Sequence, residues 1–141
     1  MSAPSVIVEE SPDANDIAIV AQGMRRHALS QVNGAESPPI ACFARENGSV
    51  IVGGVVGRIV KNRLFVDLLW VEERRRNSGL GSSLLQALER AAIQQGCRDV
   101  LLETLSASAG RLYSRLGYRL VAKIPDYIPG FVKYVFIKSL A

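Results

Sequence analysis

Residues 64–96 have the strongest pattern of the sequence, and they read LFVDLLWVEERRRNSGLGSSLLQALERAAIQQG. The first eight residues are almost wholly apolar, which predicts a central strand covered on both faces. Residues 72–78 are polar and predict a loop. From Leu80 onward, apolar residues recur at helical spacing as far as Gly96, a residue type favoured just past a helix end. The stretch therefore predicts a strand, a basic loop and an amphipathic helix in direct succession.

The rest of the chain predicts further strands and helices around this stretch. Strands are expected over residues 5–10, 40–45, 50–60, 64–71, 100–105, 118–124 and 131–140, and helices over residues 13–31, 80–96 and 107–116. The resulting order, β-α-β-β-β-α-β-α-β-β, predicts an α/β protein of the α+β type with a mixed, largely antiparallel sheet. The strand–helix–strand segment 64–105 implies one parallel pairing with a right-handed crossover. Residues 125–130, which contain proline and glycine, are expected to connect the last two strands.

Length and composition bound the class of protein. The chain has 141 residues, of which 48% are hydrophobic and 21% charged, so we expect one globular domain over residues 1–141. Two cysteines and one histidine are too few for a disulfide framework or a zinc site, and no metal is expected. No run of residues approaches the length of a membrane helix, and the first residues lack the features of a signal peptide. A cytoplasmic protein with no membrane partner is therefore expected.

Positive charge is concentrated in the second part of the chain. Residues 61–141 hold 13 of the 17 basic residues and 7 of the 13 acids, a net charge of +6. This excess suits a polyanionic partner, such as a phosphorylated cofactor, a nucleic acid or a membrane surface. A nucleic-acid partner is not expected, because aromatic residues are not interleaved with the basic ones and the arginines concentrate at one helix start.

The loop before the second helix has the properties of an anion site. Three arginines, Arg74 to Arg76, stand just upstream of Gly79 and Gly81. A helix start leaves backbone N–H groups unpaired, glycine lets a phosphate approach the backbone, and guanidinium groups suit phosphate oxygens. The P-loop pattern is absent, and the G-x-G-x-x-G pattern is incomplete because residue 84 is leucine. The alternative is an ordinary helix start with solvated arginines.

Two motifs resemble those of a known enzyme family, the GNAT N-acetyltransferase superfamily. They are Arg76-x-x-Gly79-x-Gly81, which matches [QR]-x-x-G-x-[GA], and Tyr113-x-x-x-Gly117-Tyr118, which resembles Y-x-x-x-G-[FY]. The element order also resembles that family over nearly the whole chain, and the chain looks like a small bacterial single-domain member. The resemblance implies the GNAT acyl-CoA N-acyltransferase fold with splayed central strands, acetyl-CoA as the donor and an amine as the acceptor.

The resemblance also implies where acetyl-CoA binds. Its pyrophosphate is expected on backbone N–H groups of the loop, and its pantetheine arm beside the end of the apolar strand. The strand is expected to splay from its neighbour at residues 100–105 and so open a cleft for the thioester. The expected cofactor-binding residues are Leu69, Trp70, Val71, Arg75, Arg76, Asn77, Ser78, Gly79, Leu80, Gly81 and Ser82.

Tyr113, Asp67 and Glu103 are the expected catalytic residues. Acyl transfer to an amine requires loss of a proton from the ammonium group, a donor for the oxyanion and a proton for the leaving thiolate. The resemblance assigns the oxyanion to a backbone N–H near Val71 and the acid to Tyr113, whose phenol is protonated at neutral pH. The base is left open between Asp67, Glu103 and a water-relayed transfer, and strict alternation places Asp67 on the face of Leu69 and Val71. The alternatives are salt bridges for the acids and packing for the tyrosine.

The expected function is transfer of an acetyl group from acetyl-CoA to a primary amine by direct attack in a ternary complex. A small-molecule acceptor is favoured over a protein amine, because the chain has no extra domain for holding a large partner. Tyr127, Phe131 and Tyr134 are expected to border the acceptor pocket or to pack in the core. Phe131 stands where a subgroup of similar proteins often has histidine, so any role of that histidine is absent. The other functions left open are a non-catalytic acyl-CoA sensor and a protein N-terminal or lysine acetyltransferase, and a homodimer is a further expectation.

Overall fold

The structure of the chain is a computed structural model that describes residues 2–32, 34 and 37–141. It contains two compact units, Met1–Glu36 and Ser37–Ala141. That residues 1–141 form a single domain stays a prediction. None of the helices in the described ranges combines the length and the apolar character that crossing a bilayer requires.

The first unit is built around helix α1 (Ala14–Gln31). The Asp13 side chain accepts a 2.7 Å hydrogen bond from the Asn15 backbone N–H, which caps the helix start. None of the helical residues is buried, and the apolar side chains of Ile17 and Met24 are more than half exposed. The helix expected here from its apolar spacing is confirmed.

The strand expected over residues 5–10 is not formed. Residues 2–9 lie outside helices and strands, and no backbone hydrogen bond joins them to another described residue. A strand exists through hydrogen bonds to a neighbouring strand. The apolar residues Val6 and Val8 favour a strand, but no described strand pairs with this segment. The element order therefore begins with α1.

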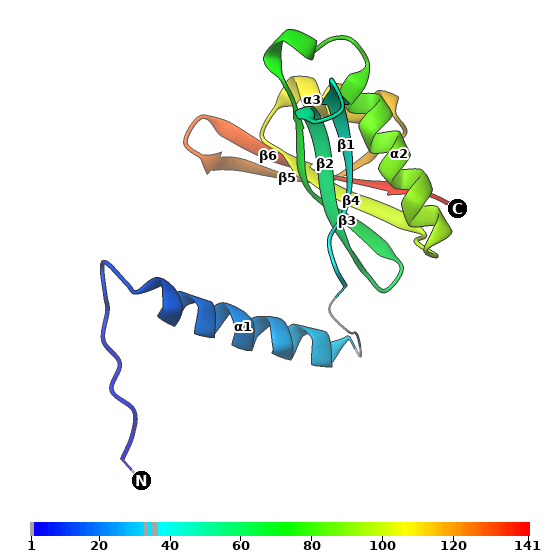
Figure 1. The fold of residues 1–141 in the computed structure, drawn as a ribbon. Coiled ribbons are helices and arrows are strands. Elements are labelled where there is room, and N and C mark those ends of the chain that lie inside the picture. Colours follow the sequence, from blue (N-terminus) through cyan, green and yellow to red (C-terminus); the bar gives the residue numbers. More distant parts are fainter. Residues whose placement is uncertain (1, 33, 35–36) are drawn as a thin grey trace. The chain divides into compact units, whose positions relative to one another are not determined.

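The second unit is a six-stranded sheet with helices packed on it (Figure 1). The strands are β1 (Ile40–Glu46), β2 (Val50–Val60), β3 (Arg63–Val71), β4 (Asp99–Thr104), β5 (Arg119–Ile128) and β6 (Phe131–Ser139). The helices are the short 3-10 turn η1 (Glu73–Arg75), α2 (Leu80–Gln94) and α3 (Ala107–Arg115). The strand order is β1-β2-β3-β4-β6-β5, and only the β3–β4 pairing is parallel. The predicted mixed, largely antiparallel α+β fold is confirmed.

Helices α2 and α3 share one core on one face of the sheet. The Tyr113 ring of α3 lies 5.8 Å from the Phe136 ring of β6, edge to face. Full burial of one leucine stabilises the fold by roughly 1.5–3 kcal/mol relative to exposure, so the apolar stripe of α2 holds that helix to the sheet. The stripe consists of residues that are each less than 5% exposed, namely Leu84, Leu85, Leu88 and Ala92.

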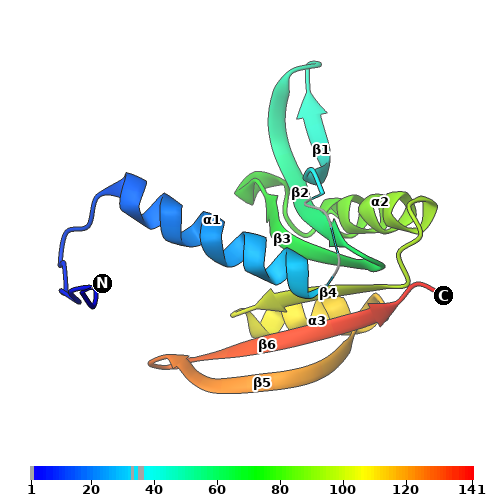
Figure 2. The ribbon, with the colours of Figure 1, turned by 90° about the horizontal axis from the view of Figure 1, so that it is seen from below.

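The sheet divides between β3 and β4. Their pairing covers only Arg63–Phe65 against Asp99–Leu101, and beyond it the two halves of the sheet diverge (Figure 2). Where the pairing begins, the Arg63 guanidinium donates two 2.8 Å hydrogen bonds to the Asp99 carboxylate. These bonds hold the pKa of the Asp99 carboxyl below its usual value. The expected splay of the central strands is therefore confirmed.

A β-bulge in β3 lies at Asp67. Val56 pairs with Leu68 and Gly57 pairs with Val66, which leaves Asp67 as the extra residue. A Cβ atom on Gly57 would lie 2.5 Å from a carbonyl oxygen of β3, so the close approach opposite the bulge requires glycine.

The bulge interrupts the alternation of side chains along β3. Leu69 and Val71 pack against the core, whereas the Asp67 side chain is 42% exposed and pairs with Arg58. The prediction that Asp67 shares the face of Leu69 and Val71 is therefore wrong, because one extra residue shifts the period of two.

Strand β5 runs further than expected. Residues 125–128 belong to it, and only Pro129 and Gly130 turn the chain. The register shifts between Ile124 and Ile128, and Asp126 has a left-handed φ of 51°. The expected connection over residues 125–130 is thus mostly a bulged strand. The bounds of the remaining elements agree with the sequence prediction to within two residues.

Candidate active site

Two cavities border the split between β3 and β4, and no described residue lines both. The loop cavity, of about 710 Å³, is lined by Leu69, Val71, Arg75, Arg76, Asn77, Gly79, Leu80, Gly81, Ser82, Ser108, Ala109, Arg111, Leu112 and Arg115. The sheet cavity, of about 640 Å³, is lined by Arg58, Phe65, Val66, Asp67, Leu101, Glu103, Thr104, Leu105, Tyr127 and Lys133.

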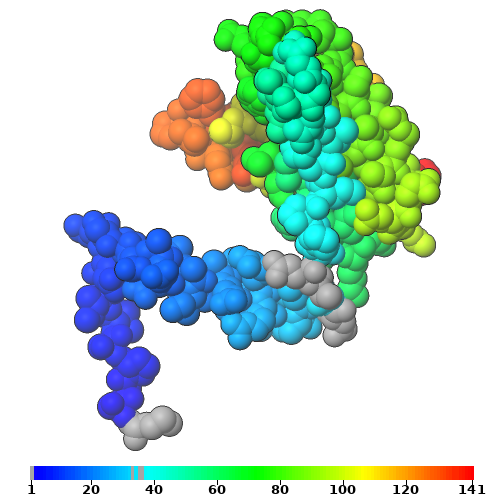
Figure 3. Space-filling view, in the orientation of Figure 1, coloured from blue at the N-terminus to red at the C-terminus, as the bar shows by residue number. Residues whose placement is uncertain are grey.

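The sheet cavity lies on the face of the sheet opposite the helices. Along β4, Val100 and Leu102 are buried in the core beneath the helices, whereas the alternate residues Leu101 and Glu103 line the sheet cavity. Figure 3 shows this hollow between the orange β5–β6 hairpin and the green strand β3. The two cavities therefore approach the split from opposite faces.

The start of α2 has open backbone donors. Gly79 precedes the helix with a left-handed φ of 84°, and no side chain caps it. The first helical bond runs from the Ser83 N–H to the Gly79 carbonyl at 3.0 Å. The N–H groups of residues 80–82 have no partner in the part of the chain that the structure describes. These N–H groups and the helix dipole are able to stabilise an anion at this wall of the loop cavity.

The backbone of β3 is also open beside the loop cavity. The Glu72 N–H donates to a β2 carbonyl at 2.8 Å, which makes the Val71–Gly53 pair the non-hydrogen-bonded kind. In this register the N–H and C=O groups of Leu69 and Val71 point away from β2, toward the side where β4 has separated. The Val71 carbonyl accepts a 3.0 Å hydrogen bond from Arg76 Nε. The other outward N–H and C=O groups of this strand edge can bind an extended ligand.

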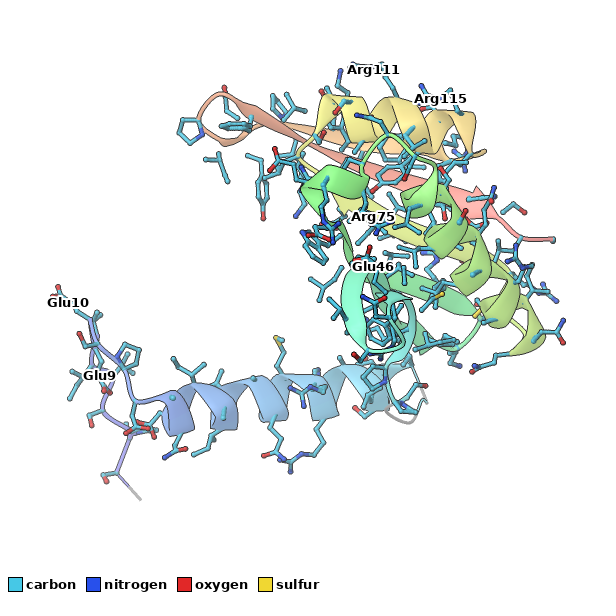
Figure 4. The ribbon with its side chains drawn as sticks, turned by 45° about the horizontal axis from the view of Figure 1, so that its top comes forward. Glu9, Glu10, Glu46, Arg75, Arg111 and Arg115 are labelled. Carbon is cyan, nitrogen blue, oxygen red and sulfur yellow. The ribbon has the colours of Figure 1, made fainter. Side chains whose placement is uncertain are left out.

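Positive charge surrounds the loop cavity. Within the described ranges, its charged lining residues are Arg75, Arg76, Arg111 and Arg115, with no acid among them. Glu46, at the end of β1, forms an ion pair with Arg75, and Figure 4 shows these two residues together. Glu46 also binds Arg74 at 2.8 Å. Glu46, which holds the arginine loop to the β1–β2 hairpin, was not predicted from the sequence.

Nine of the eleven expected cofactor-binding residues line the loop cavity. The exceptions are Trp70, which is 51% exposed, and Ser78, whose hydroxyl donates to the Arg75 carbonyl. The wall that α3 supplies was not predicted from the sequence, although its residues recur at intervals of three and four and so share one face of the helix. They are Ser108, Ala109, Arg111, Leu112 and Arg115.

Asp67 and Glu103 come together in the sheet cavity, each in an ion pair. Arg58 Nε lies 3.3 Å from Asp67 Oδ2, and Lys133 Nζ lies 2.7 Å from Glu103 Oε2. The hydrogen bond to Glu103 raises the pKa of Lys133. The salt bridges that the sequence analysis left as an alternative are therefore present, and the role of either acid as base stays a prediction.

Aromatic rings form part of the sheet cavity wall. The Arg58 guanidinium lies 4.5 Å from the centre of the Phe65 ring, and the Lys133 ammonium lies 4.2 Å from the centre of the Tyr127 ring. Tyr127 thus lines the sheet cavity, whereas Phe131 and Tyr134 do not, and a role in the acceptor pocket stays a prediction. Tyr134 packs against the core instead.

Tyr113 has a buried ring and an accessible hydroxyl. The residue is 7% exposed and lines neither cavity. Its hydroxyl forms no hydrogen bond with a described residue. Every buried side-chain oxygen of the described residues has a hydrogen-bond partner, so this hydroxyl is not buried and reaches the surface. Burial raises the pKa of the phenol, which therefore stays protonated at neutral pH. Its role as the acid stays a prediction.

The split sheet and the open donors at the start of α2 agree with the fold that the two sequence motifs imply. Residues 10–118 match the acetyltransferase (GNAT) family, and the chain belongs to this family. The protein is therefore an acetyltransferase, and its family implies acetyl-CoA as the donor.

Individual relatives agree with this assignment. The chain is 40% identical over 118 residues to the blasticidin-S acetyltransferase of Streptomyces morookaense, a match that covers 80% of this chain and 86% of that protein. The fold also matches the crystal structure of an Agrobacterium tumefaciens protein, with a TM-score of 0.87, at 22% identity, over 96% of this chain and 99% of that chain. That of an acetyltransferase from Bacillus cereus superposes with a TM-score of 0.76, at 27% identity, over 94% of this chain and 97% of that chain.

Proposed function

We propose that this protein transfers the acetyl group of acetyl-CoA to a primary amine of a small molecule by direct attack in a ternary complex. The observation that carries this proposal is the pair of cavities on opposite faces of the sheet, both bordered by β3 where β4 has separated. Two substrates that enter from opposite faces can meet at the split. The 40% identity to blasticidin-S acetyltransferase supports a small-molecule acceptor.

The donor set of the loop cavity fits acetyl-CoA, which supplies the acetyl group as a thioester. The open N–H groups of residues 80–82 suit the diphosphate. The outward N–H and C=O groups of Leu69, and the second lone pair of the Val71 carbonyl beside its bond from Arg76, suit the amides of the pantetheine arm, which would pair with them as an added strand does. The Val71 N–H is then the donor for the oxyanion.

The sheet cavity suits the acceptor amine. An ammonium group can take the place of Arg58 or Lys133 beside the Asp67 or Glu103 carboxylate, because both acids are only partly buried. The amine must lose a proton before it attacks, and Asp67, Glu103 or a water molecule accepts that proton. As the amine attacks and the C–S bond breaks, Tyr113 donates a proton to the leaving thiolate, and the second proton lost by the attacking nitrogen restores the phenol.

Thermal unfolding and thiol release test the proposal together. Acetyl-CoA at 100 times its Kd should raise the free energy of unfolding by about 2.7 kcal/mol. Release of the coenzyme thiol should then depend on a small primary amine, in a panel that contains blasticidin S and peptides with a free N-terminus or lysine. A missing thermal shift overturns acetyl-CoA as the donor, and turnover of peptides alone favours a protein acetyltransferase. A shift without turnover of any acceptor favours a sensor.

Tyr113→Phe is expected to lower kcat by about 100-fold while acetyl-CoA affinity stays nearly unchanged, because only a proton donor is lost. The raised pKa of Tyr113 also predicts that no fall in kcat below pH 10 comes from its ionisation. Stopped-flow thiol release and calorimetry measure the two quantities. Undiminished kcat would remove Tyr113 from the acid role.

Asp67→Asn and Glu103→Gln are expected to separate the two candidate bases. The variant that removes the base should lose about 100-fold in kcat at pH 7 and regain activity as pH rises, because more of the free amine is then supplied by solution. Initial rates between pH 7 and pH 9.5 measure this, with Glu73→Gln, an exposed acid outside both cavities, as the control. Unchanged rates in both variants would leave the water-relayed transfer.

A cytoplasmic location and a homodimer stay part of this proposal. The location rests on the free cysteines Cys42 and Cys97, which suit a reducing compartment. Light scattering of the purified protein tests the dimer.

A further inference from the structure

Helix α3 brings two unpartnered arginines to the loop cavity. Arg111 and Arg115 are exposed and line the cavity, and neither forms an ion pair or hydrogen bond with a residue that the structure describes. They stand four residues apart, so they are neighbours on the helix surface, where like charges destabilise a helix. Helix stability therefore does not explain this pair.

The arginines on the facing loop are already engaged. Arg75 forms an ion pair with Glu46, and Arg76 Nε donates to the Val71 carbonyl at 3.0 Å. The diphosphate of the proposed donor is matched by the open N–H groups of residues 80–82. The α3 pair is thus a second cationic wall of the same cavity, with no acid to neutralise it.

Coenzyme A carries a phosphate in addition to its diphosphate, namely the 3′-phosphate of its ribose. A phosphate monoester has a charge near −2 at neutral pH and offers three acceptor oxygens. We infer that Arg111 and Arg115 bind the 3′-phosphate of coenzyme A and so distinguish it from 3′-dephospho-coenzyme A. Two guanidinium groups match that charge and supply several N–H donors. Figure 4 shows both arginines on α3, with Arg75 on the loop.

This inference rests on the proposed use of acetyl-CoA and deepens it. It predicts that the two walls of the cavity bind different phosphate groups. The start of α2 binds the diphosphate, and α3 binds the 3′-phosphate monoester. Loss of the α3 cations should then affect coenzyme A and leave the dephosphorylated form almost unaffected.

Titration calorimetry with coenzyme A and 3′-dephospho-coenzyme A tests the inference. The wild-type protein should bind coenzyme A at least about tenfold more tightly than the dephosphorylated form. The double variant Arg111→Gln/Arg115→Gln should lose about 10–50-fold in affinity for coenzyme A and less than about threefold for 3′-dephospho-coenzyme A. Arg90→Gln, an exposed arginine of α2 that lines neither cavity, should leave both affinities unchanged.

The ratio of the two dissociation constants within one preparation decides the outcome, because a misfolded fraction affects both ligands equally. Equal losses for both ligands would overturn the inference, since the arginines would then act on a part that the ligands share. Unchanged affinity for both would overturn it too. Failure of the wild-type protein to bind either ligand would instead overturn the proposed function and this inference with it. The variants Arg111→Lys and Arg115→Lys should retain most of the discrimination, because the charges remain.

Discussion

Gly81→Asp is expected to lower the affinity for acetyl-CoA by at least about 100-fold while the fold stays intact. Gly81 is the second residue of α2, and its N–H is one of the open donors in the wall of the loop cavity. A carboxylate at this position repels the diphosphate and competes with it for the same N–H groups. The same carboxylate stabilises the helix by about 0.3–1 kcal/mol, because an acid in the first turn complements the helix dipole. Binding and stability should therefore change in opposite directions.

Gly81→Ala is the matched control for this variant. Its Cβ would lie 3.7 Å from Val71 Cγ2, an ordinary van der Waals contact, so affinity should stay within a few-fold of wild type. Calorimetry measures the affinity, and thermal unfolding without ligand measures the stability of each variant. Wild-type affinity in the aspartate variant would contradict an anion site at the start of α2. An equal loss of affinity in the alanine variant would show that the added volume, and not the added charge, weakens binding.

Glu89→Leu is expected to lower the free energy of unfolding by about 2–4 kcal/mol. Glu89 is 5% exposed and accepts a 2.6 Å hydrogen bond from the Tyr118 hydroxyl and a 2.8 Å hydrogen bond from Lys138 Nζ. Leucine keeps the volume but leaves a buried hydroxyl and a partly buried ammonium group without their acceptor. The Lys138 side chain is 22% exposed and keeps some contact with water, which moderates the loss.

Urea unfolding of single and triple variants tests this network. Replacing all three polar groups, with Glu89→Leu, Tyr118→Phe and Lys138→Met, should recover most of the lost stability, because no unpaired polar group then remains. Burial, and next the Glu89 carboxylate, raise the pKa of the Tyr118 phenol. The contribution of Tyr118 should therefore be complete below pH 10 and decline only above it. A loss below about 1 kcal/mol in Glu89→Leu, or no recovery in the triple variant, would contradict the role of the network.

Elements with local signals were predictable from the sequence. Strand β2 has its expected bounds, Val50–Val60, because the turn before it contains Asn47 and Gly48, both with the positive φ that such a turn requires. Helix α2 follows from its apolar spacing and from the glycine at its start. Residues 5–10 have the composition of a strand, but no described strand forms hydrogen bonds with them. The sequence of the segment itself does not indicate that a partner strand is missing.

The residues of the candidate site likewise fall into those that the sequence predicted and those that it did not. The loop residues from Arg75 to Ser82 are adjacent in the chain, so a local motif predicts most of the cavity wall that the loop and the start of α2 form. Glu46, Arg111 and Arg115 are distant in sequence from this loop. Only the packing of β1 places Glu46 beside Arg75, and only the packing of α3 places the two arginines in the cavity wall. Asp67 was assigned to the wrong face, because Gly57 of the neighbouring strand allows the bulge that reverses it.

The amino-acid sequence alone was enough to predict the family, the strand–loop–helix order and the glycine-rich start of α2, because these features depend on side-chain period and on glycines within a few residues of each other. The tertiary structure decided where β3 and β4 separate, which face each acid occupies and which arginines form the second wall of the loop cavity. Those features depend on register and packing between segments far apart in the chain, where a shift of one residue moves a side chain to the opposite face.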